Sequence, residues 1–251
     1  MKKILIVLFL IPIFSFGQAK KKAKAAVVKT KTTITKTNAT PLSAAVSPAL
    51  LDISGGLKEA LTNGVTKEVS KLTAVDGFFK NESVKILLPE ELSTMEATLR
   101  KFGMDKYADD AILSINRAAE DAVKEATPIF INAIKNMNIA DAKSILTGSE
   151  NAATNYLQKA TTKELYAKFS PVVQQSIGKV GADVVWTSMI NKYNKIPLVS
   201  KVNPDITDYV TNKALEGVFK MITVEEKNIR ANLKSRTSPL LQSVFGLLDK
   251  K

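Results

Sequence analysis

The sequence predicts an all-α protein, a compact bundle of about eight to ten helices with at most one short extended segment near residues 83–88. Apolar residues recur at the spacing of an amphipathic helix over most of the chain after residue 50. Hydrophobic residues make up 45% of the chain but aromatic residues only 6%, so Ala, Leu, Ile and Val must fill the core. The single β-rich run has no second run to pair with, and a lone strand makes no sheet.

Residues 1–17 have the features of a secretory signal peptide. Lys2 and Lys3 precede the apolar run Ile4–Phe14, and Ser15-Phe16-Gly17 ends in the small-x-small pattern of a cleavage site. The apolar run is too short to span a bilayer, which takes about 20 residues. Because no cysteine is present for lipid attachment, we expect an exported, soluble protein of the periplasm or extracellular space. It would be neither a lipoprotein nor a transmembrane protein after signal cleavage.

Residues 18–48 contain no acidic and no aromatic residue, and we expect a basic disordered tether. Nine lysines within residues 1–40 supply most of the net charge of +12, and the rest of the chain has 27 basic against 24 acidic side chains. This balance does not support nucleic-acid binding. A solvated spacer is the favoured role; the alternative is weak contact with an anionic surface, worth about 1 kcal/mol per lysine. That contact would use Lys20, Lys21, Lys22 and Lys24.

Residues 49–251 are expected to form a single helical domain. Its first helix is predicted to start near Ser54-Gly55-Gly56 and to end before Asp76-Gly77. Ser83–Pro89 then forms an extended connector, after which Pro89-Glu90-Glu91 opens a second helix. The apolar face of the first helix consists of Leu57, Ala60, Leu61, Val65, Val69 and Leu72.

A helix over about residues 105–126 has the most regular apolar face in the chain. Its many alanines allow a neighbouring helix to pack closely, so we place it in the middle of the bundle. Thr127-Pro128 indicates the next helix start. Asn138 is predicted to cap a helix over 139–146. Asp141 is predicted to interact with the dipole of this helix and to accept from a free backbone N–H at its start.

The C-terminal half contains several further start signals that predict separate helices. They are Ser149 before 150–159, the capping-box pattern Thr161-x-x-Glu164, Ser170-Pro171, a second such pattern Thr223-x-x-Glu226, and Ser238-Pro239.

The chain contains no cysteine and no histidine. Thiol nucleophiles, Ser-His-Asp triads and the usual zinc, haem and iron–sulfur sites are therefore excluded. We expect no metal and no other cofactor, and no catalytic motif is recognisable. Only acid–base chemistry by carboxylates or binding of Ca²⁺ or Mg²⁺ through oxygen ligands stays open.

Short motifs in a fixed order resemble the DUF4197 family of exported bacterial proteins, over about residues 50–246. The resemblance implies a mostly helical exported protein and brings no activity, substrate or catalytic residue. The motifs are Asp76-Gly77-Phe78, Val84-Lys85-Ile86-x-Leu88-Pro89, Asn116-Arg117-Ala118-Ala119-Glu120, Pro128-Ile129-Phe130, Asp141-Ala142-x-x-Ile145-Leu146-x-Gly148, Ala152-Ala153-Thr154-x-Tyr156-Leu157, Phe169-x-Pro171, Glu225-Glu226-x-x-Ile229-Arg230, Arg236-Thr237 and Leu240-Leu241-x-x-Phe245-Gly246.

Polar residues at the edge of the alanine-rich helix are the first candidates for a ligand-binding site. Asn116 and Glu120 flank that edge, where a half-buried polar side chain needs a partner. With Arg117 they either line a polar pocket or fix the packing of helices, and the structural role is favoured. The full candidate set is Asn116, Arg117, Glu120, Tyr156, Arg230 and Arg236.

Two functions follow from these observations. The first is a non-enzymatic binding or interaction module of the cell envelope, with a groove between helices for a small apolar ligand or an envelope protein. The second is a carboxylate-dependent hydrolase acting on an envelope polymer, with Glu120 as the acid. The hydrolase needs a second carboxylate within about 5–10 Å of Glu120 in an open cleft.

Overall fold

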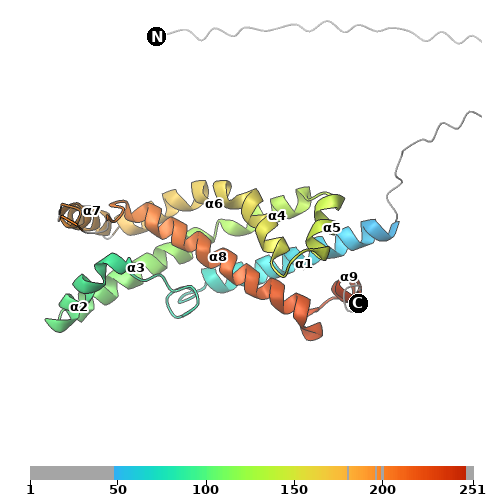
Figure 1. Ribbon diagram of the computed structural model, residues 1–251, viewed down its shortest axis with the longest axis horizontal. Helices are drawn as coiled ribbons and strands as arrows, with labels where there is room; N and C mark the ends of the chain where they lie inside the picture. The colour runs from blue at the N-terminus through green and yellow to red at the C-terminus, as the bar shows by residue number, and fades with distance from the viewer. Residues whose placement is uncertain (1–47, 180, 196, 199–200, 247–251) are drawn as a thin grey trace, which may run out of the picture. The chain divides into compact units, whose positions relative to one another are not determined.

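A computed structural model describes residues 48–179, 181–195, 197–198 and 201–246 (Figure 1). These residues form nine α-helices and two short 3-10 helices and contain no strand, which confirms the predicted all-α fold. In the predicted extended segment, Ser83 and Val84 lie in a turn and residues 85–89 have no regular secondary structure. The predicted signal peptide and all but the last residue of the predicted tether lie outside the described residues. No described helix is both long enough and apolar enough to cross a membrane.

The described helices have the following bounds, with the 3-10 helices labelled η. They are α1 Pro48–Thr73, η1 Glu90–Leu92, α2 Ser93–Lys101, α3 Asp105–Val123, α4 Ala126–Asn136, α5 Ile139–Thr147, α6 Ala152–Gly178, α7 Ala182–Tyr193, α8 Ile206–Ala231, η2 Leu233–Ser235 and α9 Pro239–Gly246.

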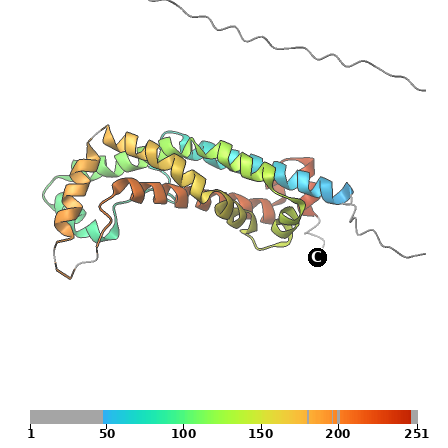
Figure 2. The same ribbon diagram turned by 90° about the horizontal axis from the view of Figure 1, so that it is seen from above.

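The centre of the fold is the contact among α3, α6 and α8, which lie next to one another in Figures 1 and 2. Ala118, Ala119 and Ala122 of α3 are at zero exposure there. The interior position predicted for this helix is confirmed for its C-terminal half, whereas Ala111 nearer its start is exposed. Phe130 of α4 and Phe219 of α8 pack edge to face in the same core, with ring centroids 5.8 Å apart.

A smaller apolar cluster joins α1, α5, α8 and α9. It contains Leu57, Ile145, Ile229, Leu241 and Phe245, all buried. These helices meet at the end of the domain where α9 packs on α1 (Figure 1).

The predicted start of the first helix at Ser54-Gly55-Gly56 is wrong, because α1 runs through both glycines from Pro48. Close packing accounts for Gly56: a Cβ atom there would lie 2.5 Å from Cγ2 of Val244 and 2.8 Å from Cγ of Leu240, both on α9. Gly55, by contrast, faces open space. One glycine of the pair thus serves a helix contact and not a helix end.

The separate helices predicted from Ser149, Thr161 and Ser170-Pro171 are one continuous helix, α6. Thr161 lies inside it and donates its hydroxyl to the carbonyl of Leu157 at 2.6 Å, as threonine can within a helix. Fully burying Leu157, Leu165 and Phe169 stabilises α6 by about 1.5–3 kcal/mol each, which outweighs the roughly 3 kcal/mol cost of an interior proline.

Two other start signals also fall inside helices. Thr223 lies within α8 and donates to the carbonyl of Phe219 at 2.9 Å, so it does not begin a helix. α4 begins at Ala126, ahead of Thr127-Pro128. The cap at Asn138 is confirmed: its side chain accepts from the N–H of Asp141 at 2.8 Å, and the Asp141 carboxylate accepts from the N–H of Asn138 at 3.1 Å.

Candidate functional site

The loop between α1 and α2 is fastened to α3 by the candidate residues Asn116, Arg117 and Glu120. The structure brings these three side chains together beneath residues 76–86. The two other arginines of the candidate set, Arg230 and Arg236, do not contact Glu120 and bond elsewhere.

Asn116 is fully buried and pairs with the backbone of Ile86 as a neighbouring strand would. Its Oδ1 accepts from the N–H of Ile86 at 2.8 Å, and its Nδ2 donates to the carbonyls of Ile86 and Ile112, both at 2.7 Å. Both amide hydrogens and the amide oxygen are therefore occupied. Asn116 holds the connector in place and has no donor left for a ligand.

Glu120 receives hydrogen bonds from the loop and from its own helix. Its Oε1 accepts from the N–H groups of Phe78 at 3.0 Å and Phe79 at 3.3 Å, and its Oε2 accepts from Nη1 of Arg117 at 2.6 Å. The side chain is only 5% exposed. Both carboxylate oxygens are engaged away from solvent, so Glu120 fastens the loop.

Arg117 extends this network to Asp76, which begins the loop with a left-handed backbone at φ +69°. Asp76 also pairs with Lys80 at 2.8 Å. Hydrogen bonds from Lys80 and then from Arg117 lower the pKa of Asp76 below its usual value. Hydrogen bonds to Glu120 and then to Asp76 raise the pKa of Arg117. Asp76 and Arg117 therefore both stay charged at neutral pH.

The two residues after Asp76 complete the turn by close packing. A Cβ atom on Gly77 would lie 2.4 Å from the carbonyl oxygen of Lys71, so only glycine fits there. The ring of Phe78 is completely buried, and its Cε1 lies 2.7 Å from where a Cβ of Gly217 would stand. The loop therefore presses directly against α8.

A second polar cluster joins α8 to the corner between α5 and α6. Glu226 accepts from the N–H of Ala153 at 3.0 Å and from the N–H and hydroxyl of Thr154, both at 2.8 Å. One turn later, Arg230 donates to the carbonyls of Ile145 and Leu146 at 2.8 and 3.2 Å and pairs with Glu226 at 2.9 Å.

This pair completes two helix ends at once. The N-cap residue of α6, Asn151, makes no side-chain cap bond, so the free N–H groups of the first turn take the Glu226 carboxylate instead. The Arg230 guanidinium takes carbonyls in the last turn of α5. An anion at a helix N-terminus and a cation at a helix C-terminus both interact favourably with the helix dipole.

The remaining candidates also bond to backbone. Arg236 is 2% exposed and donates to the carbonyls of Ile229 and Arg230 at the end of α8, at 3.1 and 2.9 Å. The hydroxyl of Tyr156 donates to the carbonyl of Ala133 at 3.4 Å. Burial raises the pKa of this hydroxyl, with a smaller contribution from Asp141.

Sequence reasoning missed Asp76 and Glu226 as members of these clusters. Both stand in the motifs that carry the family resemblance, Asp76-Gly77-Phe78 and Glu225-Glu226-x-x-Ile229-Arg230, so the motifs already contained the signal. Glu226 was interpreted as part of a local cap, whereas it caps a helix 72 residues earlier.

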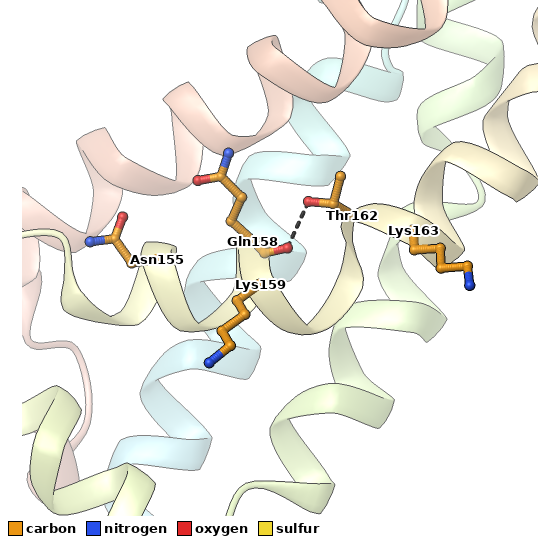
Figure 3. A pocket seen from close by; sticks show the side chains of 5 residues that line it. All are labelled: Asn155, Gln158, Lys159, Thr162 and Lys163. Carbon is orange, nitrogen blue, oxygen red and sulfur yellow. Dashed lines mark hydrogen bonds between the residues drawn. The ribbon is translucent and has the colours of Figure 1, made fainter.

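Three recesses on the described surface differ in their suitability for a ligand. One of about 20 Å³ lies among α1, α6, α8 and α9 and is too small for anything beyond a water molecule. A recess of about 500 Å³ lies beside α6, but its lining residues are exposed side chains of one helix that fan outward, as Figure 3 shows. These are Asn155, Gln158, Lys159, Thr162 and Lys163.

The third recess, of about 310 Å³, lies between the connector and α8. Residues 83–87 form one wall, and a single face of α8 forms the other, with Tyr209, Lys213, Glu216, Gly217 and Lys220. We call it the connector groove. It has two walls from different parts of the chain, and one of them is fixed by Asn116.

No group of three or more acidic residues in the described part of the chain is arranged to hold a metal ion. The described helices define an all-α protein in which buried polar residues fix the loop between α1 and α2 against α3, and the loop packs on α8. The family described as "Protein of unknown function (DUF4197)" matches residues 48–246, and the chain belongs to this family. No curated protein and no solved structure matches the chain.

Proposed function

We propose that this chain is an exported, non-enzymatic binding module of the cell envelope and that its ligand occupies the connector groove. The observation that carries the proposal is the construction of this groove. Its volume of about 310 Å³ falls at the lower end of the range for small-ligand sites. Its connector wall is fastened to the buried helix α3, so the groove is formed before a ligand arrives.

The chemistry of Glu120 argues against the hydrolase alternative. A general acid must reach its substrate, whereas both oxygens of Glu120 accept bonds from the protein and its side chain is 5% exposed. The nearest carboxylate in the network, Asp76, shares Arg117 with it and bonds Lys80. Neither group faces an open cleft with a free oxygen.

The envelope location rests on the N-terminal sequence. A charged start, a short apolar run and a small-x-small end favour export, and Gln18 would then be the first residue of the mature protein. N-terminal sequencing of protein recovered from the envelope fraction tests this, and a product that retains Met1 would contradict it.

Co-purification from the native envelope tests the binding role. We expect native mass spectrometry of the full chain to find a bound species that is lost from the K213Q/K220Q variant. The K159Q/K163Q variant removes the same charge from exposed lysines of α6 and should retain it. A species retained by both variants, or none with either, would contradict the proposal.

A further inference from the structure

We infer that the connector groove takes an extended peptide segment with acidic side chains, which lies along residues 85–87 as an added strand. The inference rests on the function proposed above and names the class of its ligand. Two independent features of the groove carry it, an open backbone edge and an excess of positive charge.

The direction of the backbone edge follows from Asn116. Both the N–H and the carbonyl of Ile86 bond to the amide of Asn116, which requires an extended backbone at Ile86 that faces α3. In extended backbone, neighbouring residues present their polar groups to opposite edges. The N–H and carbonyl groups of Lys85 and Leu87 therefore face away from α3.

Two of the four backbone N–H and carbonyl groups of Lys85 and Leu87, on the edge that faces away from α3, are already bonded. The N–H of Lys85 donates to the carbonyl of Asn81 at 2.8 Å, and the carbonyl of Leu87 accepts from the hydroxyl of Tyr209 at 2.8 Å. The carbonyl of Lys85 and the N–H of Leu87 have no partner in the described part of the chain. Leu87 itself is 56% exposed.

The two open groups have the spacing that one residue of a parallel strand satisfies. In a parallel ladder, a residue donates to the carbonyl before its neighbour and accepts from the N–H after it. With Ile86 as that neighbour, these groups belong to Lys85 and Leu87. An amide-containing chain can fill both positions, as in strand addition to an exposed edge.

The charge of the groove selects acidic side chains. Three lysines and one glutamate line it, a net charge of +2, although the folded part of the chain is nearly balanced. Lys213 is paired with Glu216 at 2.7 Å, and Lys85 lies over the ring of Phe79 at 5.0 Å. Lys220 is exposed and has no ion partner among the described residues.

The backbone edge distinguishes a peptide from other anions. A phosphate-rich polymer or a lipid head group could pair with the lysines but has no amide N–H for the carbonyl of Lys85. The connector therefore offers one free backbone acceptor, the carbonyl of Lys85, and one free donor, the N–H of Leu87. This combination favours a protein segment as the ligand.

Fluorescence anisotropy with the full exported chain tests the inference. The probe is a labelled short peptide that alternates glutamate and valine, with the same peptide N-methylated at alternate amides as its control. We expect the N-methylated peptide to bind about two- to tenfold more weakly, because it loses the backbone bond to the carbonyl of Lys85. Equal binding of both peptides would overturn the inference.

Variants of the protein separate the two features. L87P removes the open N–H and should weaken peptide binding about two- to tenfold, whereas L87A keeps the N–H and should bind more tightly than L87P. K213Q/K220Q should weaken binding about three- to tenfold, and K159Q/K163Q should leave it unchanged. Thermal unfolding of L87P should match that of L87A, since no protein bond is lost.

The outcomes distinguish this inference from the proposed function. If the envelope species depends on the groove lysines but neither peptide binds, the peptide inference is overturned and the binding module stands. Preferential, groove-dependent binding of polyphosphate or anionic vesicles would also overturn it. If the groove variants affect neither the envelope species nor the peptides, both proposals fail.

Discussion

Removing the Glu226 carboxylate should unfold the protein far more easily than removing its neighbour Glu225. The E226A variant leaves two helix N–H groups and one hydroxyl without their acceptor, around a side chain that is 5% exposed. It also removes the ion partner of Arg230, which keeps only the carbonyls of Ile145 and Leu146. Removing one partner of such a buried pair costs about 3–5 kcal/mol. E225A breaks a bond to Lys67, which is 53% exposed, and should cost about 1 kcal/mol or less.

Urea unfolding followed by helical circular dichroism and by the fluorescence of Trp186, the only tryptophan, measures this difference. With a denaturant slope of about 2–3 kcal/mol/M, the midpoint of E226A should fall by roughly 1–2 M and that of E225A by less than about 0.5 M. E226Q keeps one acceptor and should lie between them. Equal midpoints for E225A and E226A would refute the assignment of Glu226 as the cap of α6.

Three further predictions concern other parts of the domain. G56A should destabilise the domain by about 1–3 kcal/mol, because the added methyl group pushes α9 away. Position 55 faces open space, so G55A should stabilise α1 by up to about 1 kcal/mol. Differential scanning calorimetry of the two variants measures the difference, and equal effects would contradict the packing of Gly56 on α9. Asp76 has a lowered pKa in the folded state, so its ion pairs stabilise the fold above about pH 4 and cease to do so as the pH falls through the folded pKa. The difference in unfolding free energy between wild type and D76N should therefore vanish in acid. A difference that stays constant with pH would count against the ion pairs. The hydrogen bond to Asp208 raises the pKa of Tyr166 to about 12. The stabilisation of the folded state by this bond is therefore complete below about pH 10 and is lost between about pH 10 and pH 12. In a spectroscopic titration of tyrosinate, the step at the highest pH should be missing from Y166F.

The fold was predictable because it rests on helical periodicity and small residues. The cap at Asn138 and the burial of Ala119 and Ala122 in α3 depend on neighbours within one or two turns, and both are confirmed. Helix ends were less predictable. Thr161 and Thr223 have the local pattern of a cap, but burial of the apolar stripe continues each helix past them.

The candidate clusters were only half predictable for the same reason. The Arg117–Glu120 pair lies within one helix turn, so its existence could be expected from spacing. Its loop partners, the N–H groups of Phe78 and Phe79, are some 40 residues earlier and leave no periodic trace. The connector groove depends on such a contact, because the pairing of Asn116 with Ile86, 30 residues earlier, fastens its connector wall to α3.

The Glu226–Arg230 pair also sets an order for folding. The corner between α5 and α6 has its free N–H groups and carbonyls satisfied by side chains that come 72 to 85 residues later in the chain. Until α8 packs against this corner, the backbone groups at the two helix ends have no side-chain partner. Contacts between residues so far apart in the sequence form slowly. For a chain exported as proposed above, the corner between α5 and α6 is therefore completed only when α8 emerges.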